Sequence, residues 1–350
     1  MDNIRRIIVI VTCLVLIGAG VVGFMFALDN IKTPNDSVEQ KTVYLKGGEP
    51  IDLSGDTGEH QTVAEPSDIS TTLFVLTDNS DENAELIFTA TVDYISKKID
   101  LIFYPVDMSI ALKIDSETTE FGTLADFYKN RGFDILSEAV GGIFSCSVKA
   151  AVAFNEDALF KKLIFGFTSD KTDEGIEYCS PRRIDAYSSS GVYVSVAKGK
   201  SYFNYDKAIK LLTFYKTADG TYGKDIAGFY DGTRAPQNKV AATFAYSFIT
   251  QRLIGLEDGS YYSSQYRKIF NTFLENCKGK APEGFPQKFY EMRNEFKSEN
   301  VSVYTVNVET DKSGTAFVYS NSVSKLRNDS GTIVSEVIKH ENVSDRIKFY

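Results

Sequence analysis

Residues 72–104 read TLFVLTDNSDENAELIFTATVDYISKKIDLIFY, and their pattern predicts three neighbouring strands. The run 72–76 is almost entirely apolar, which is typical of a strand buried on both faces. It ends in a turn that contains Asp78, a residue type that favours turns. Residues 86–94 and 99–104 are strand-like and are separated by Ser-Lys-Lys, so they predict a hairpin.

Helical spacing of apolar residues predominates after these strands. Asn155 stands where an N-cap is expected, at the start of one of the helical segments. Strands and helices mixed in this order predict an α/β fold, expected here as an α-β-α sandwich around a central mixed sheet. The predicted helices are 124–128, 134–140, 155–165, 205–215 and 237–253.

The chain beyond residue 255 changes in composition. We expect a C-terminal α+β extension, residues 256–350, packed on the main domain, with an independent module as the alternative. Its predicted helices are 263–277 and 286–296, and its predicted strands are 301–309 and 315–319.

The N-terminus carries an uninterrupted apolar segment, residues 7–28, directly after Arg5 and Arg6. About 20 apolar residues suffice to cross a bilayer, and a basic flank tends to stay cytoplasmic. A cleavable signal peptide is the alternative, but its apolar region is normally about 7–15 residues long and ends at a small-x-small site, which residues 25–27 do not form. We therefore expect a single-pass membrane anchor with residues 1–6 in the cytoplasm and the rest of the chain outside.

A polar segment, residues 29–69, follows the anchor and predicts a flexible stalk. The net charge of −9 argues against a nucleic-acid partner, whose binding site normally needs a basic face. Residues 182–239 reverse this balance with ten Lys or Arg against five Asp, a net charge of +5. That segment is interpreted either as an anion-facing region or as lysines on solvated helix faces.

The cysteines and histidines exclude several kinds of site. Cys13 lies in the apolar segment, and Cys146, Cys179 and Cys277 are too far apart for zinc-ligand or C-x-x-C spacing. A Cys146–Cys179 disulfide and buried free thiols remain the two alternatives. The two histidines, at 60 and 340, lie in a polar segment and near the C-terminus, which argues against a histidine-based triad.

Several motifs resemble the LytR-CpsA-Psr (LCP) family of cell-envelope proteins. The resemblance covers residues 70–255 and rests on the order of elements more than on individual motifs. It includes the anchor, the stalk, the first strand leading to Asp78, and the hairpin that ends in Tyr-Pro-Val-Asp at 104–107. The helical middle at 122–167 and the segments 205–209 and 231–234 also match.

The resemblance implies an activity. Members of the family transfer glycopolymers from a polyprenyl pyrophosphate carrier to peptidoglycan, with the lipid tail in an apolar groove. Arginines hold the pyrophosphate, while acidic residues hold Mg²⁺ and assist the attack. Such a division suits phosphoryl transfer, in which positioning and charge neutralisation dominate. The implied partners are a polyprenyl-phosphate-linked glycan, peptidoglycan and the membrane.

Residues are carried over from the family position by position. Arg234 and Asp107 are the candidate catalytic residues, and Arg234, Gln237 and Lys239 are the candidate substrate-binding residues. Asp78 and Glu85 are the candidate Mg²⁺ ligands, although each can also serve as an ordinary turn or strand-end residue. Arg234 lies in a Gly-Thr-Arg-Ala-Pro loop just before a predicted helix, where backbone donors and a cation can converge on an anion.

Most of the family's arginines are absent from this chain. Asparagine, valine, threonine, tyrosine and glutamine stand at their positions, and none of these side chains supplies a guanidinium fork for phosphate. One preorganised donor is worth about 3–4 kcal/mol to a transition state, so catalysis by the family mechanism is in doubt. Lysines of the basic segment are candidate replacements. The substituted positions are Asn83, Val106, Thr213, Tyr215 and Gln237, and the candidate lysines are Lys207, Lys210, Lys216 and Lys239.

Three classes of function follow. The first is an active Mg²⁺-dependent glycopolymer phosphotransferase with a remodelled site. The second is a non-catalytic relative that binds polyprenyl-phosphate lipid or glycan. The third is an envelope scaffold or regulator without a ligand.

Overall fold

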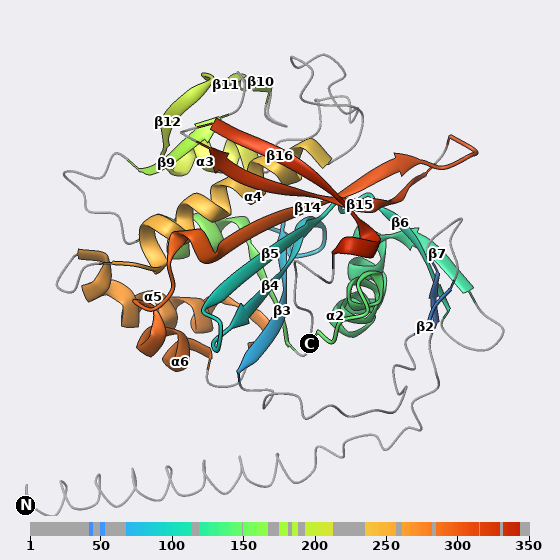
Figure 1. Ribbon diagram of the computed structural model, residues 1–350, viewed down its shortest axis with the longest axis horizontal. Helices are drawn as coiled ribbons and strands as arrows, with labels where there is room; N and C mark the ends of the chain where they lie inside the picture. The colour runs from blue at the N-terminus through green and yellow to red at the C-terminus, as the bar shows by residue number, and fades with distance from the viewer. Residues whose placement is uncertain are drawn as a thin grey trace, which may run out of the picture. The chain divides into compact units, whose positions relative to one another are not determined.

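The computed structural model is a mixed α/β structure (Figure 1). It describes residues 42–44, 50–52, 68–113, 119–148, 150–166, 175–180, 184–187, 193–212, 235–256, 261–281, 285–314, 316–329 and 332–343. No helix within these ranges is long and apolar enough to cross a membrane, and the predicted anchor at residues 7–28 lies outside them.

A mixed eight-stranded sheet forms the centre, in the order β13-β8-β3-β4-β5-β14-β15-β16. The pairs β3/β8 and β5/β14 are parallel, and the other neighbours are antiparallel. The strands are β3 (Ile69–Thr77), β4 (Ala84–Asp93), β5 (Lys98–Tyr104), β8 (Ala150–Asn155), β13 (Lys278–Lys280), β14 (Val301–Thr310), β15 (Phe317–Asp329) and β16 (Thr332–Lys339).

One face of this sheet packs against α2 (Leu124–Ile143). Side chains alternate between the faces of a strand, so Leu73 and Val75 of β3 share this face with Ile87 of β4. Thr123 begins the helix with a capping box: its Oγ1 accepts from the Asp126 N–H at 3.1 Å, and Asp126 Oδ2 accepts from the Thr123 N–H at 3.0 Å.

The helix α2 is kinked at Gly132, whose φ of 75° is open to glycine. The kink explains why the sequence predicts two helical segments, 124–128 and 134–140, where the structure has one interrupted helix. Both predicted segments are helical.

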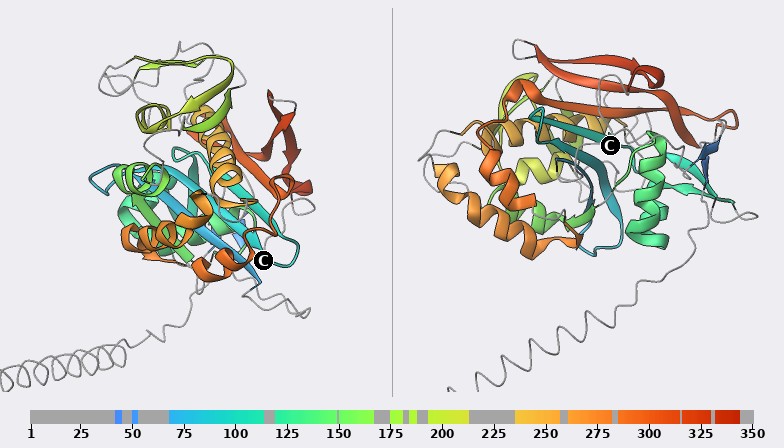
Figure 2. Two further views of the ribbon diagram at one scale, coloured as in Figure 1. Left: turned by 90° about the vertical axis from the view of Figure 1, so that its left-hand side faces the viewer. Right: turned by 60° about the horizontal axis from the view of Figure 1, so that its bottom comes forward.

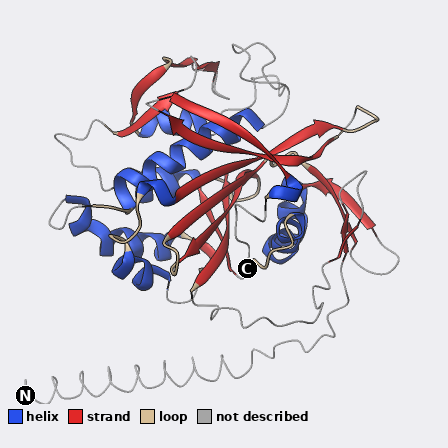
Figure 3. Cartoon of the chain, viewed as in Figure 1, coloured by secondary structure: helices blue, strands red, loops and turns tan. Residues whose placement is uncertain are grey.

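A second set of helices covers the opposite face, as Figures 1 and 2 show on the other side of the sheet from α2. Two of them are π-helices, a rare form that often occurs at functional sites. These elements are η1 (Asp157–Ile164), α3 (Tyr205–Leu212), α4 (Ala235–Phe248), η2 (Ile249–Leu253), α5 (Tyr261–Asn276) and α6 (Phe285–Met292). Figure 3 shows the resulting layers of helix, strand and helix.

Asn155, predicted as an N-cap, lies one residue before the assigned cap of η1, Glu156. Its Oδ1 nevertheless accepts from the Ala158 N–H at 2.9 Å, as a capping side chain does. The predicted hairpin and the helical segment 237–253 are confirmed, the latter as α4 continued by η2. The segment after residue 255, expected to pack on the main domain, supplies four strands of the central sheet, with β13 at one edge and β14 lying parallel to β5.

Smaller sheets lie outside the central one. Two short strands fall within the segment predicted to be a flexible stalk, and β1 pairs with β6; most of that segment lies outside the described residues, so the stalk stays a prediction. Their backbone hydrogen-bonds to a folded strand despite the polar composition of the segment. The elements are β1 (Thr42–Tyr44), β2 (Pro50–Asp52), β6 (Ser109–Lys113), β7 (Thr119–Thr123), β9 (Ile176–Ser180), β10 (Ile184–Tyr187), β11 (Tyr193–Val196) and β12 (Gly199–Phe203). Two 3₁₀ turns are η3 (Ser298–Asn300) and η4 (His340–Asn342).

Candidate functional site: an apolar cavity beside a carboxylate edge

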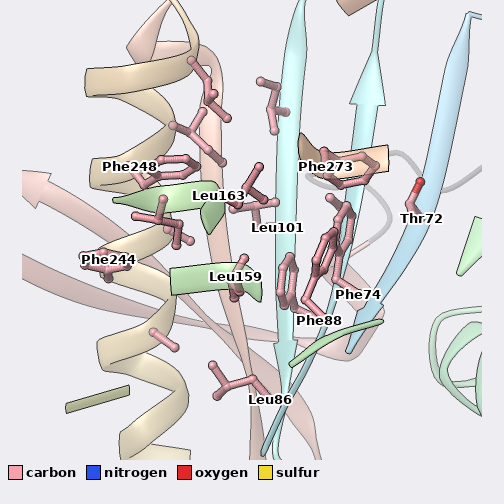
Figure 4. Close-up of a pocket in the computed structure, with 18 of the residues that line it drawn as sticks. Thr72, Phe74, Leu86, Phe88, Leu101, Leu159, Leu163, Phe244, Phe248 and Phe273 are labelled. Carbon is pink, nitrogen blue, oxygen red and sulfur yellow. The ribbon is translucent and has the colours of Figure 1, made fainter. Parts of the chain in front are cut away.

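An apolar cavity of about 200 Å³ lies between the central sheet and the helices opposite α2. Strands β3, β4 and β5 form one wall, and η1, α4, η2, α5 and α6 form the other. Figure 4 shows Phe74, Phe88 and Leu101 facing Phe244 and Phe248 of the α4–η2 region, with the η1 leucines between them. Such a lining offers water few hydrogen-bond partners and favours an apolar ligand.

A row of stacked phenylalanines crosses the sheet wall of the cavity. The ring centroids of Phe74 and Phe88 are 4.9 Å apart, and those of Phe88 and Phe103 are 4.7 Å apart, with nearly parallel planes. Phe74 and Phe88 are only half-buried although they lie between two layers of the fold. Their incomplete burial indicates that the space beside them is not filled by the chain itself.

The cavity is elongated along the strands. On β4 its lining runs from Leu86 to Val92, six residue-to-residue steps that together rise roughly 20 Å. Ser70 and Ile99 line it beside Val92. This shape suits a chain-like apolar ligand better than a compact ring.

Polar residues collect at one end of the sheet. The strands β3, β5 and β8 run in the same direction, and β4 begins where they end. We call the acidic side chains that collect where β3 and β8 end and β4 begins the carboxylate edge: Asp78, Asp81, Glu85, Glu156 and Asp157.

Asp78 organises the turn between β3 and β4. Its Oδ1 accepts from Ser80 Oγ at 2.8 Å and from the Glu82 N–H at 3.1 Å, and its Oδ2 accepts from Asn83 Nδ2 at 2.6 Å. Partial burial alone would raise the pKa of Asp78, but these donors and the Asn83 N–H lower it below its usual value. The side chain thus acts as the turn residue that the alternative interpretation describes.

Glu156 stands between β8 and η1 and has an unusual environment. Burial, with a further contribution from the negative charges of Glu85, Asp78 and Asp157, raises the pKa of its carboxyl to about 7. Glu85 itself is buried, with 7% of its surface exposed. The structure therefore brings Asp78 and Glu85 near a third carboxyl that sequence reasoning did not select.

Two lysines, one from α2 and one from β13, lie at this edge. Lys129 of α2 donates to Asn83 Oδ1 at 3.1 Å, and Lys278 of β13 forms an ion pair with Asp81 Oδ2 at 2.8 Å. Sequence reasoning missed both, because neither falls in a family motif and they are 149 positions apart in the chain. Only the pairing of β13 with β8 brings Lys278 to this edge.

The carboxylate edge adjoins the cavity. Leu86 directly follows Glu85 of the edge in sequence, and its side chain lines the cavity. Phe154 lies two residues before Glu156 and lines the cavity too. Phe160, the fourth residue of η1, also lines it. An amphiphile whose chain enters the cavity at this end would place its polar head against the edge.

Asp107 and Val106 follow β5. Val106 is buried with 3% exposure, and its carbonyl accepts from the Ala125 N–H at 2.9 Å, so it is a core residue. Asp107 is half-buried beside it. The family's arginine position is thus occupied by a residue that fixes the turn against α2.

Only some of the remaining predicted site residues lie within the part of the chain that the structure describes. Arg234, Thr213, Tyr215, Lys216 and the side chains of Lys210 and Gln237 lie outside the described residues. Lys239 lies in α4 and is half-buried. Lys207 contacts its own neighbourhood: its Nζ donates to the Tyr202 carbonyl at 3.3 Å and lies 5.5 Å from the Phe203 ring centroid.

No disulfide links Cys146, Cys179 and Cys277, so the pairing of the first two is not formed. Burial raises the pKa of Cys146 to about 12, which leaves that thiol protonated and unreactive.

A divalent cation such as Mg²⁺ would need several oxygen donors grouped at this edge. In the described ranges, no three His, Cys, Asp or Glu side chains are grouped so as to hold a metal ion. Both carboxylate oxygens of Asp78 accept hydrogen bonds within the turn. The described residues therefore do not by themselves form the ligand set expected for Mg²⁺.

No family model and no curated protein sequence matches this chain. Among solved structures, it is similar to TagV of B. subtilis, with a TM-score of 0.55 and 14% identity over 72% of this chain and 90% of TagV. A candidate transcription regulator of Eubacterium siraeum gives a TM-score of 0.55 and 16% identity, over 75% and 92% of the two chains. Protein gbs0355 of Streptococcus agalactiae gives 0.53 and 14%, over 73% and 83%.

TagV is an LCP-family protein, so the resemblance seen in the sequence is confirmed at the level of the fold. At these identities the likeness concerns the arrangement of the backbone. It does not extend to the arginine-bearing motifs, from which this chain departs.

Proposed function

We propose that this chain is a membrane-anchored cell-envelope protein that binds a polyprenyl-phosphate-linked glycan. The polyprenyl chain occupies the apolar cavity, and the phosphate head lies at the carboxylate edge. The observation that carries the proposal is the cavity itself, which is apolar, elongated and bordered by polar groups at one end. The shared fold with TagV supports a role in envelope glycopolymer metabolism.

Charge at the edge decides how the head group binds. Lys129 and Lys278 are the described cations that contact it, and they face a larger number of carboxylates. Phosphate therefore binds there only if Arg234 or a divalent cation contributes further positive charge, because opposite charges must compensate its desolvation. The described residues alone do not form a Mg²⁺ site, so Mg²⁺ is proposed only as a counter-ion that arrives with the phosphate.

Transfer of the glycan to peptidoglycan is the second candidate function. It is favoured by the retention of Asp107 at the end of β5 and of Arg234 in its loop. Against it stand Val106, which is part of the core, and Asp78, whose oxygens hold a turn. We therefore place binding without efficient turnover ahead of transfer.

The test measures binding and turnover together. The full chain in nanodiscs is titrated calorimetrically with farnesyl phosphate, with and without Mg²⁺, and with empty nanodiscs as the control for partitioning. Phe88→Ala, which opens the cavity wall, is compared with Phe121→Ala, an exposed phenylalanine on β7. Release of polyprenyl phosphate from a glycan-loaded carrier is followed in parallel.

We expect saturable binding that Phe88→Ala weakens more than about tenfold, since several buried carbons lose their contacts, while Phe121→Ala leaves it unchanged. Binding without release of polyprenyl phosphate supports the binding role, and release supports transfer. Absence of saturable binding in the wild-type chain contradicts the proposal.

A further inference from the structure

The far end of the cavity, opposite the carboxylate edge, is closed by α6. Phe289 of α6 is buried and lines the cavity. Its ring stacks on Phe296 with centroids 5.4 Å apart, and Phe296 in turn meets Tyr94 edge-on at 6.1 Å. Tyr94 directly follows β4, so this aromatic series lies beyond the last cavity row on that strand.

Two polar contacts hold α6 over this end. Lys288 Nζ forms an ion pair with Asp68 Oδ1 at 3.0 Å and lies 4.5 Å from the Tyr94 ring centroid. Asp68 precedes β3, and its carbonyl accepts from the Tyr94 N–H at 2.8 Å. The end wall is therefore tied to the strands that form the cavity, and a ligand meets a fixed barrier there.

The cavity has a limited length. Three extended backbone bonds span about 3.5 Å, so the four main-chain bonds of one isoprene unit span about 4.5 Å. A length of roughly 20 Å then admits about four units. The volume admits fewer isoprene units than the length does. Since a 150 Å³ cavity holds one benzene ring, about 200 Å³ corresponds to roughly two units.

We propose that Phe289, held by the α6 contacts, sets the number of isoprene units that the protein binds, between two and four. This inference rests on the proposed function and adds a limit on the length of the prenyl chain that is bound. Units that enter the cavity lose contact with water and tighten binding, whereas units that exceed the space in front of the Phe289 wall stay outside the cavity and contribute no further affinity.

The experiment measures the dissociation constant as a function of chain length. The full chain in nanodiscs is titrated with prenyl monophosphates of two, three, four and five isoprene units, with empty nanodiscs as the reference. Phe289→Ala removes the wall, and Phe289→Leu removes less of it in case the first variant does not fold. Ser70→Leu places extra carbons in the far row of the cavity, and Phe121→Ala is the matched control on β7.

Each added unit should tighten wild-type binding by more than about tenfold until a plateau between two and four units. The plateau should move at least one unit longer in Phe289→Ala or Phe289→Leu and one unit shorter in Ser70→Leu, and it should stay in place in Phe121→Ala. Affinity that rises through five units, or a plateau that none of the cavity variants moves, overturns the inference while the proposed function stands. Failure to bind any of the four ligands contradicts the proposed function itself.

Discussion

The two faces of the central sheet are built from alternate residues of the same strands, yet they are packed differently. On the α2 face, Leu73, Val75 and Ile87 are at most 1% exposed and lie in a filled core. On the opposite face, Phe74 and Phe88 are half-buried beside a cavity. Adjacent residues of one strand thus serve different purposes: the α2 face supplies stability, and the other face offers a binding site.

The largest expected effect on stability comes from truncating the side chains of two adjacent residues of β4, one on each face of the sheet. Ile87→Ala leaves a void in a filled core and should lower the free energy of unfolding by about 2–5 kcal/mol. Phe88→Ala should cost less although it removes more atoms, because its ring already borders empty space. Urea denaturation of both variants checks this, and an equal or greater loss for Phe88→Ala would show that the two faces are packed alike.

Enlarging an alanine on each face gives the second comparison. Ala139 of α2 is fully buried, so Ala139→Leu overpacks the core and should cost about 1–3 kcal/mol. Ala90 lines the cavity, so Ala90→Leu should be neutral or stabilise the protein by about 0.5–2 kcal/mol. Thermal and urea unfolding measure both, and calorimetry should show that only Ala90→Leu blocks farnesyl phosphate. A destabilising Ala90→Leu would argue against free space at that position.

A smaller effect separates stability from binding. Thr123→Ala removes the capping box of α2 and should cost about 1 kcal/mol of unfolding free energy. Because Thr123 does not line the cavity, the affinity for a prenyl phosphate should not change, whereas Thr123→Ser should keep both properties. A loss of affinity in Thr123→Ala with normal stability would show that the cap of α2 contributes to the site.

The smallest effect concerns pH. The folded pKa of Glu156 is raised to about 7, so the folded chain holds this proton more tightly than the unfolded chain. Its contribution to stability is therefore full at low pH and is lost as pH rises toward and through 7. Glu156→Gln should raise the melting temperature more at pH 8.5 than at pH 6. Glu299→Gln, an exposed acid on η3, is the control and should show no such difference; a pH-independent shift in Glu156→Gln would contradict the assigned environment.

The central strands were predictable because their signals are local. The apolar run 72–76 and the hairpin that follows it depend on neighbouring residues alone, and both are present as β3, β4 and β5. The strand β8 was missed because Ala150–Asn155 is short and directly precedes a helical pattern. Its place beside β3 depends on a parallel pairing across 70 or more residues, which no local pattern specifies.

The strand β15 is longer than its prediction, extending over Phe317–Asp329, because its later part is polar. Its backbone there pairs with β14 and β16, so the strand is stabilised by tertiary hydrogen bonds and not by an apolar run. The 3.6-residue and 2-residue periods likewise gave no sign that η1 and η2 would be π-helices.

The candidate site was only partly predictable. The placement of Asp78 and Glu85 at one end of the sheet follows from strand order, and the structure brings both near Glu156. Lys129 and Lys278 could not be found from spacing, because each reaches the edge through a different neighbouring element. The roles proposed for Arg234 and Gln237 stay predictions, since Arg234 and the Gln237 side chain lie outside the described residues.

The most direct measurement of the central claim is photo-crosslinking of the full chain in nanodiscs with a diazirine-bearing prenyl phosphate, followed by mapping of the modified residues by mass spectrometry. The account predicts labelling of cavity-lining side chains such as Phe74, Phe88 and Leu159, reduced by competition with unlabelled ligand. Labelling that spares these positions, or that competition does not reduce, would contradict the account.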